Sequence, residues 1–196
     1  MNRMKKLFGT TLFAAALLAS ALFTACNDDD DAAALTAADL TGTYAGTFDF
    51  TPSPSDLNPE PAPETGVAVE LKVENGKVVF PEFPAATLVK ALVGEEGAAG
   101  LVPMLGTISY EATIDTQAAD ADALVATLDT PVLRLDIGPG VLVVLITIES
   151  PDELRYTKEG TLTFTLKTTQ CQLGEGDTAG SPFDLVNELK FTVAKR

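Results

Sequence analysis

Residues 67–80 read Val67-Ala68-Val69-Glu70-Leu71-Lys72-Val73-Glu74-Asn75-Gly76-Lys77-Val78-Val79-Phe80, and this stretch decides the fold. Apolar and polar side chains alternate from Val67 to Glu74, which is typical of a strand with one buried face. Asn75-Gly76 is the residue pair that a tight type I′ turn prefers, and the chain returns as far as Phe80. The stretch therefore predicts a β-hairpin in which Glu74 faces Lys77 and Leu71 faces Phe80.

The same alternation continues on both sides of this hairpin. Before it, residues 42–50 form an alternating strand, and residues 51–65 carry five prolines (52, 54, 59, 61 and 63), which indicate an extended loop at a rim. After it, alternating segments predict strands around residues 108–114, 124–128, 133–137, 141–148, 162–166 and 189–193. Short strands separated by turn residues predict a mainly β fold, a single antiparallel β-barrel or sandwich of about 8–10 strands.

One segment changes period and predicts the only helix, which is short. Leu88, Val89 and Leu92 within residues 85–93 have helical spacing, Gly94 ends the helix, and a loop runs through Glu95 and Glu96 to Gly100. Residues 141–146 are apolar on both faces, so something must cover the outer side of that strand. Either this helix or a second subunit covers it, and the helix is favoured because its own apolar face needs burial.

The N-terminus predicts export. Residues 1–25 have the three zones of a secretory signal peptide, with basic residues at 3, 5 and 6, an apolar stretch from Leu7 to Phe23, and small residues at Thr24-Ala25. An uncleaved membrane-spanning helix is the less favoured alternative, because the stretch is at the short limit for a span. We expect a signal peptide at 1–25, a flexible lipidated tether at 26–39 and a β-barrel domain at 40–196.

Leu22-Phe23-Thr24-Ala25-Cys26 resembles a bacterial lipobox, which implies that Cys26 carries lipid and anchors the protein to a membrane. The next residues resemble the export tag of Bacteroidetes lipoproteins; they are Asn27, Asp28, Asp29, Asp30 and Asp31. That resemblance implies that the protein is attached to the outer membrane on its cell-surface face. A calcium site in this run is disfavoured, because consecutive aspartates cannot converge their oxygens without a turn and distal ligands.

Leu40-Thr41-Gly42-Thr43-Tyr44-Ala45-Gly46-Thr47-Phe48 resembles the first strand of calycin-like (lipocalin-like) lipoproteins from gut Bacteroidetes. Phe80-Pro81-Glu82-Phe83-Pro84, followed by a short helix, is similar to uncharacterised lipoproteins of the same group. The resemblance implies an antiparallel barrel, and it implies no particular activity because most members have none assigned.

Composition narrows the chemistry. The first 25 residues hold three of the 13 basic residues and none of the 28 acidic ones, so residues 26–196 carry a net charge of −18. Such a charge repels nucleic acid. The chain has no histidine, which excludes Ser-His-Asp and Cys-His catalysis and histidine metal sites. With Cys26 lipidated, Cys171 has no disulfide partner. It is expected to be a small buried or half-buried thiol rather than a catalytic nucleophile, because the chain has no histidine to activate it.

The candidate site residues are aromatic and acidic. Seven aromatic residues fall on inward positions, as core or ligand-facing side chains: Tyr44, Phe48, Phe50, Phe80, Tyr110, Phe164 and Phe191. Small inward residues at Gly46, Ala112 and Ala126 leave room for a cavity without requiring one. Acidic pairs stand at Asp129/Asp136, Glu95-Glu96, Asp120/Asp122 and Asp152-Glu153. They are interpreted as solvated surface, because a glycosidase would need two converging carboxylates and aromatic platforms.

Two functions follow as hypotheses. The first is a non-enzymatic surface binding module for an unknown small apolar or glycan-derived ligand. The second is a structural or accessory lipoprotein with a filled barrel that contacts a protein partner. A hydrolase using paired carboxylates is a distant third. No cofactor and no metal site are expected. In particular, Gly174 to Gly180 is not expected to bind calcium, because it lacks the alternating acidic ligands of a calcium loop.

Overall fold

A computed structural model describes residues 33–138, 142–175 and 178–196, with side chains placed at all of these except 178 and 179. The chain divides into two units, residues 1–31 and residues 32–196, and the fold belongs to the second. The predicted signal peptide, Cys26 and the run Asn27 to Asp31 lie outside the described residues.

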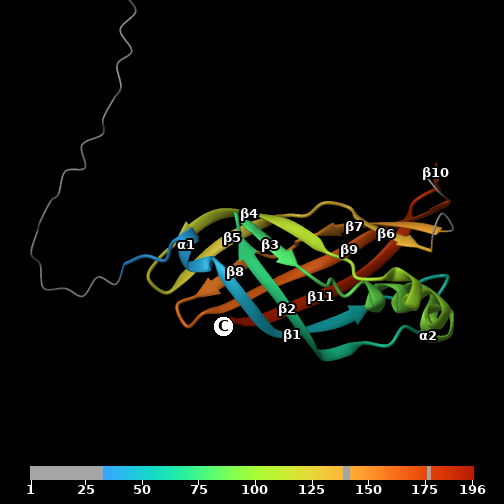
Figure 1. Ribbon diagram of the computed structural model, residues 1–196, viewed down its shortest axis with the longest axis horizontal. Coiled ribbons are helices and arrows are strands. Elements are labelled where there is room, and N and C mark those ends of the chain that lie inside the picture. Colours follow the sequence, from blue (N-terminus) through green and yellow to red (C-terminus); the bar gives the residue numbers. More distant parts are fainter. Residues whose placement is uncertain (1–32, 139–141, 176–177) are drawn as a thin grey trace, which may run out of the picture. The chain divides into compact units, whose positions relative to one another are not determined.

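The described strands form one antiparallel sheet (Figure 1). The elements are α1 Ala37–Leu40, β1 Gly42–Pro52, β2 Glu64–Glu74, β3 Lys77–Phe80, α2 Ala85–Leu105, β4 Tyr110–Ala119, β5 Ala123–Asp129, β6 Leu133–Ile137, β7 Leu142–Glu149, β8 Leu154–Thr157, β9 Thr161–Glu175, β10 Thr178–Ala179 and β11 Phe183–Lys195. Eight strands close into a ring in the order β11-β1-β2-β3-β4-β5-β8-β9, because β9 also pairs with β11. The predicted mainly β antiparallel fold is confirmed, and of the two predicted forms it is the barrel.

The long strand β9 makes this closure possible. Its first half pairs with β8, its second half pairs with β7, and its other edge pairs with β11. The hairpin of β6 and β7 therefore extends from β9 beyond the ring. The strand β8 and the full length of β9 are not apparent from the sequence pattern.

The alternation predicted for the strands is present in the barrel. Tyr44, Phe48 and Phe50 of β1 are buried, while Thr47 and Asp49 between them are exposed. Pairing of β1 with β2 brings Tyr44 opposite Leu71 and Phe48 opposite Val67. One continuous apolar core results, and it includes side chains from both helices.

The helical region is larger than predicted. The short helix does break at Gly94, whose φ of 75° and ψ of 170° are not helical. The predicted loop from Glu95 to Gly100 is wrong, because a second helical piece continues to Leu105. Ala98 and Leu105 bury this second piece against the core. The sequence does not predict this second helical piece, because it contains Gly97 and Gly100 and glycine is a poor helix former.

The predicted cover of the strand at 141–148 is also different. The principal contacts of α2 are with β6 and β11, not with β7. On β7, Val144, Ile146 and Ile148 face the core, whereas Leu142 and Leu145 are half-buried. Register places Leu145 of β7 between Arg134 of β6 and Gln172 of β9. The stems of these long side chains can shield it on the outer face.

A short segment before β1 closes one end of the barrel. Leu40 at the end of α1 is buried, and its carbonyl accepts a hydrogen bond from the Tyr44 hydroxyl at 2.6 Å. The Leu35 N–H donates to the Asp120 carbonyl at the β4–β5 turn, and Lys195 Nζ donates to the Asp39 carbonyl. The packed domain therefore includes residues 35–39, at the end of the predicted tether.

Candidate ligand-binding groove

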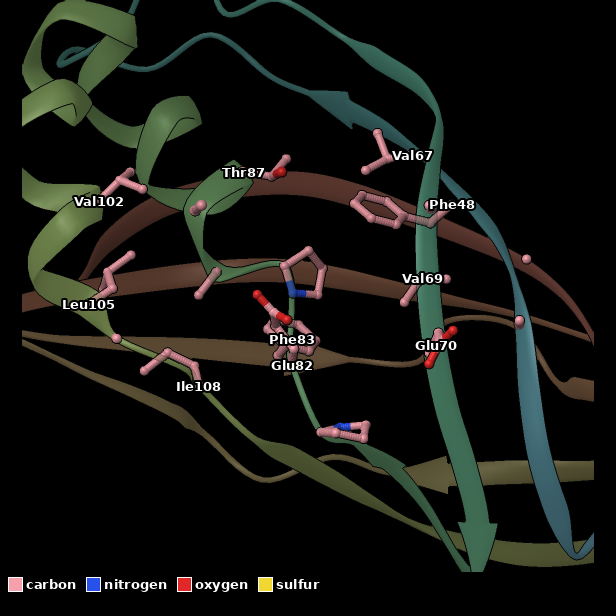
Figure 2. A pocket seen from close by; sticks show the side chains of 18 of the residues that line it. Phe48, Val67, Val69, Glu70, Glu82, Phe83, Thr87, Val102, Leu105 and Ile108 are labelled. Carbon is pink, nitrogen blue, oxygen red and sulfur yellow. The ribbon is translucent and has the colours of Figure 1, made fainter.

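A hollow lies beside β2, between this strand and the segment that leads into α2 (Figure 2). It has a volume of about 670 Å³, within the range of small-molecule sites. One side is the edge of β2, and the other is the segment 81–87 with the end of α2 and the following turn. The lining residues are Ala45, Gly46, Phe48, Val67, Ala68, Val69, Glu70, Pro81, Glu82, Phe83, Pro84, Ala85, Ala86, Thr87, Val102, Leu105, Gly106, Ile108 and Arg196.

The groove exists because the two strands of the β2–β3 hairpin differ in length. The strand β2 has 11 residues and β3 has four, and their ladder covers only Lys72 to Glu74 against Lys77 to Val79. The predicted pair of Leu71 with Phe80 is not in this ladder. Pro81 and Pro84 follow β3, and proline cannot continue a ladder because it lacks an N–H. From Glu70 back to Val67, β2 therefore pairs with β1 alone.

Alternation of the ladder decides which backbone groups face the groove. Asn75 and Gly76 both have positive φ, 52° and 71°, so they form a type I′ turn that makes Glu74 and Lys77 a hydrogen-bonded pair. Bonding direction alternates along a strand, so the odd residues 67, 69, 71 and 73 bond to β1. The hydrogen bond from the Arg196 N–H to the Thr43 carbonyl supports this assignment. It shows that the backbone groups of odd-numbered β1 residues point away from β2, so the even-numbered β1 residues bond to β2. The N–H and C=O groups of Ala68 and Glu70 therefore point into the groove.

The floor of the groove is apolar and firmly packed. Phe48, Val69 and Phe83 contribute buried side chains. The Phe83 ring packs edge-on against Phe80, with centroids 5.3 Å apart, and its centroid lies 4.9 Å from that of Tyr110. The opposite wall is held by the Phe83 N–H, which donates to the Ile108 carbonyl at 2.7 Å. The groove is therefore part of the folded core rather than a gap between loose loops.

Few charges line the groove. Glu70 on β2 pairs with Arg196 across the outer face, with 2.8 Å between Oε1 and Nη1. Glu82 stands exposed on the opposite wall and has no ion pair within the described part of the chain. Beside the groove, the Thr87 hydroxyl donates to Glu64 Oε2 at 3.3 Å, and Glu64 Oε1 lies 3.9 Å from Lys90 Nζ. The charged residues that line the groove beside its apolar floor are thus Glu70, Glu82 and Arg196.

The seven aromatic residues predicted as core or ligand-facing occupy different places in the structure. All are buried, and only Phe48 lines the groove. Phe80, Phe164 and Phe191 pack on one another in the barrel centre, with the last two stacked at a centroid distance of 4.7 Å. The Tyr110 hydroxyl donates to the Pro131 carbonyl at 2.8 Å. The aromatic side chains therefore fill the barrel interior.

The three small inward residues differ in their surroundings among the described residues. Ala112 and Ala126 are fully buried and line none of the described hollows. Gly46 does line the groove, but a β-carbon there would lie 2.2 Å from the Thr192 carbonyl oxygen. The glycine lets β11 approach β1 closely.

The predicted acidic pairs occupy the exposed surface. Asp136 pairs with Arg134, and Asp122 pairs with Lys158. Backbone N–H groups of Ala123 and Asp122 bond the Asp120 carboxylate and lower its pKa. Within the described residues, no three Asp, Glu, Cys or His side chains form a cluster able to hold a metal ion. The same residues contain no helix long and apolar enough to cross a membrane.

Most of the groove is not apparent from the amino-acid sequence. Val67, Val69 and Ile108 are ordinary strand residues in the sequence, and nothing in their type marks a binding surface. One signal was present: the outgoing strand of the hairpin is longer than the return strand before Pro81. This mismatch leaves part of one edge without a partner.

Comparisons with known proteins do not extend these observations. The chain matches no protein-family model, and neither curated proteins nor solved structures yielded a significant match.

Proposed function

We propose that this protein is a non-enzymatic binding module, and that the groove beside β2 holds a small, partly apolar or glycan-derived ligand. The observation that carries the proposal is a hollow of about 670 Å³ with an apolar floor and a polar rim. Apolar pockets with a few placed polar groups are the usual form of a ligand site. Because aromatic side chains fill the barrel centre, the proposal assigns the ligand to the wall.

In this proposal, lipid on Cys26 anchors the module to the cell-surface face of the outer membrane. The lipobox-like residues and the acidic run after them support this, as part of a Bacteroidetes lipoprotein address. Replacing Cys26 with serine should abolish incorporation of labelled palmitate and release the protein from membranes. Protease treatment of intact cells should remove the wild-type protein, and full protection would refute surface exposure.

The chain offers a clean optical test of the groove, because it contains no tryptophan. Val67→Trp places a single reporter on the groove, and Val132→Trp places one at a surface position that is 56% exposed. Nile red, a neutral apolar dye, should quench the first reporter by energy transfer at low micromolar concentration and leave the second nearly unchanged. Equal quenching of both, or of neither, would contradict a groove-bound ligand.

A second candidate function rests on the packed interior. A barrel filled by side chains fits an accessory lipoprotein that acts through contact with a protein partner. Cross-linking on intact cells followed by identification of the linked protein tests this candidate, and it predicts that Nile red binds neither reporter variant. Hydrolysis by paired carboxylates ranks third, since Asp122 and Asp136 are paired with surface cations.

A further inference from the structure

The polar groups that face the groove are those of a strand edge. The N–H and C=O of Ala68 and of Glu70 point away from β1, and neither residue makes another backbone or side-chain hydrogen bond through these groups within the described residues. Unpaired edge groups with this spacing are the pattern that an added strand recognises. An extended peptide supplies donors and acceptors with this same spacing from its own backbone.

The side chains beside this edge suit an extended peptide. Residues of an added strand point alternately to the two faces of the sheet. On the inner face they would meet Val67, Val69 and Phe83 at the groove floor. On the outer face they would meet Glu70, whose carboxylate also pairs with Arg196, and Glu82, which has no ion pair among the described residues. Alternating apolar and basic side chains match both surfaces.

Charge decides among the peptides that could occupy the edge. The net charge of −18 on residues 26–196 favours approach of a cationic strand and disfavours an acidic one. The chain's own acidic run at 27–31 is therefore a poor occupant. A second copy of this edge would bring Glu70 and Glu82 of each copy toward those of the other, which like-charge repulsion opposes.

We propose that the groove takes a short extended peptide with alternating apolar and basic side chains, which adds to β2 as a further strand. This inference rests on the proposed function and specifies its ligand class. The free edge exists because Pro81 ends β3 early, and the wall held by Phe83 keeps the space beside β2 open. Backbone pairing supplies recognition of the chain, and the floor and rim select its side chains.

The experiment uses residues 32–196, which form a compact unit of their own, and the probe peptide acetyl-Val-Lys-Val-Lys-Val-amide. Binding is measured by calorimetry at low salt. Two further peptides carry N-methyl groups on the valine amides or on the lysine amides. Only one set of amides faces β2 in a strand, so one methylated peptide should bind about tenfold weaker or not at all. The other should retain most of its affinity.

Protein variants provide the matched test. Ala68→Pro removes one groove-facing N–H and no ladder bond, and proline is tolerated at such an edge. Ala68→Val keeps the N–H and serves as the control. Ala68→Pro should weaken binding about fivefold or more, with thermal unfolding close to that of the control. Glu82→Gln should weaken binding of the lysine peptide about two- to fivefold at low salt and leave Nile red binding unchanged.

Each other outcome overturns the inference. Equal peptide affinity for Ala68→Pro and Ala68→Val, or equal loss with both methylated peptides, would exclude pairing with β2. Nile red in the groove without peptide binding would remove the peptide and leave the proposed function standing, whereas absence of both would remove the proposed function as well. Dimers that Ala68→Pro abolishes would identify a second copy as the occupant. Stronger binding of a peptide covering residues 26–36, with serine at 26, would identify the tether.

Discussion

Thr168 and Asn187 form a polar cluster inside an otherwise apolar barrel. The Thr168 hydroxyl donates to the Leu185 carbonyl at 2.6 Å and accepts from the backbone N–H and the side-chain Nδ2 of Asn187 at 3.0 and 3.1 Å. The Asn187 Oδ1 is buried with no protein partner among the described residues. The cluster sits where β11 is bulged between Asp184 and Asn187. Threonine therefore satisfies the backbone that the bulge releases, and the asparagine brings an unpaired acceptor.

The two residues should respond differently to apolar replacement. Thr168→Val leaves a buried carbonyl and a buried N–H unpaired, so we expect a loss of about 1–3 kcal/mol in the free energy of unfolding. Asn187→Leu is similar in size and removes the unpaired acceptor, so we expect little change or a small gain. Urea unfolding measures both. A larger loss for Asn187→Leu than for Thr168→Val would contradict this assignment.

Cys171 is a thiol that the fold protects. It is fully buried, and burial raises its pKa to about 12. Because the thiolate is the reactive form, we expect iodoacetamide at pH 8 to leave Cys171 unmodified in the folded barrel and to modify it rapidly in 6 M urea. Mass spectrometry of the labelled protein provides the measurement, with Cys171→Ser as the blank. Fast labelling without denaturant would show that this part of the barrel opens.

At the scale of elements, β1 and β11 lie unusually close at Gly46. A β-carbon on residue 46 would fall 2.2 Å from the Thr192 carbonyl oxygen and 2.7 Å from the Val193 α-carbon. These are backbone atoms held in a ladder, so they cannot move aside without breaking it. Gly46 is thus required for the close packing of β1 against β11.

Two alanine substitutions test this contact. Gly46→Ala should lower the free energy of unfolding by about 1–3 kcal/mol or more, because it forces two paired strands apart. Gly100→Ala in α2 meets no atom within 4 Å and should instead stabilise the protein by about 0.5–1 kcal/mol through helix propensity. Thermal and urea unfolding of the two variants provide the comparison. Equal effects would mean that β11 is not held at this distance.

Elements were predictable where their local pattern agrees with their surroundings. Alternating residues predict β1, β2 and the turn at Asn75-Gly76 because one face of each strand is buried. The second half of α2 was missed because Gly97 and Gly100 lower helix propensity there, while burial of Ala98 outweighs it. The groove was missed for a different reason: it depends on where β3 stops relative to β2. Pairing across strands is not contained in the alternation of either strand.

At the scale of the whole molecule, the barrel depends on buried tyrosines that must stay protonated. Burial raises the pKa of Tyr44 and of Tyr110 well above the ordinary value of 10.0. Tyr156 beside Tyr44 and Asp129 near Tyr110 add to the shift. In the unfolded chain both tyrosines ionise near the ordinary value, so above it the unfolded state binds fewer protons than the folded state.

The contribution of Tyr44 and Tyr110 to the free energy of unfolding should therefore not change with pH below about pH 10. Above that pH the free energy of unfolding should fall as the pH rises. Tyr110→Phe should flatten part of that fall, although it loses the bond to the Pro131 carbonyl at all pH values. Urea unfolding from pH 8 to pH 11.5, compared between the wild type and the variant, measures the slope. Parallel slopes for the two proteins would remove Tyr110 from this linkage.

The ring closes through β11, which fills the space between β1 and β9 and pairs Lys195 with Tyr44. Contacts between residues this far apart along a chain form slowly, because a long loop must close first. A chain that is synthesised N-terminus first has the edges of β1 and β9 uncovered until residues 183–195 have been made. During that interval it depends on chaperones or on dilution to avoid strand-to-strand aggregation. Closure of the ring by β11 thus competes with aggregation between chains whose strand edges are still uncovered.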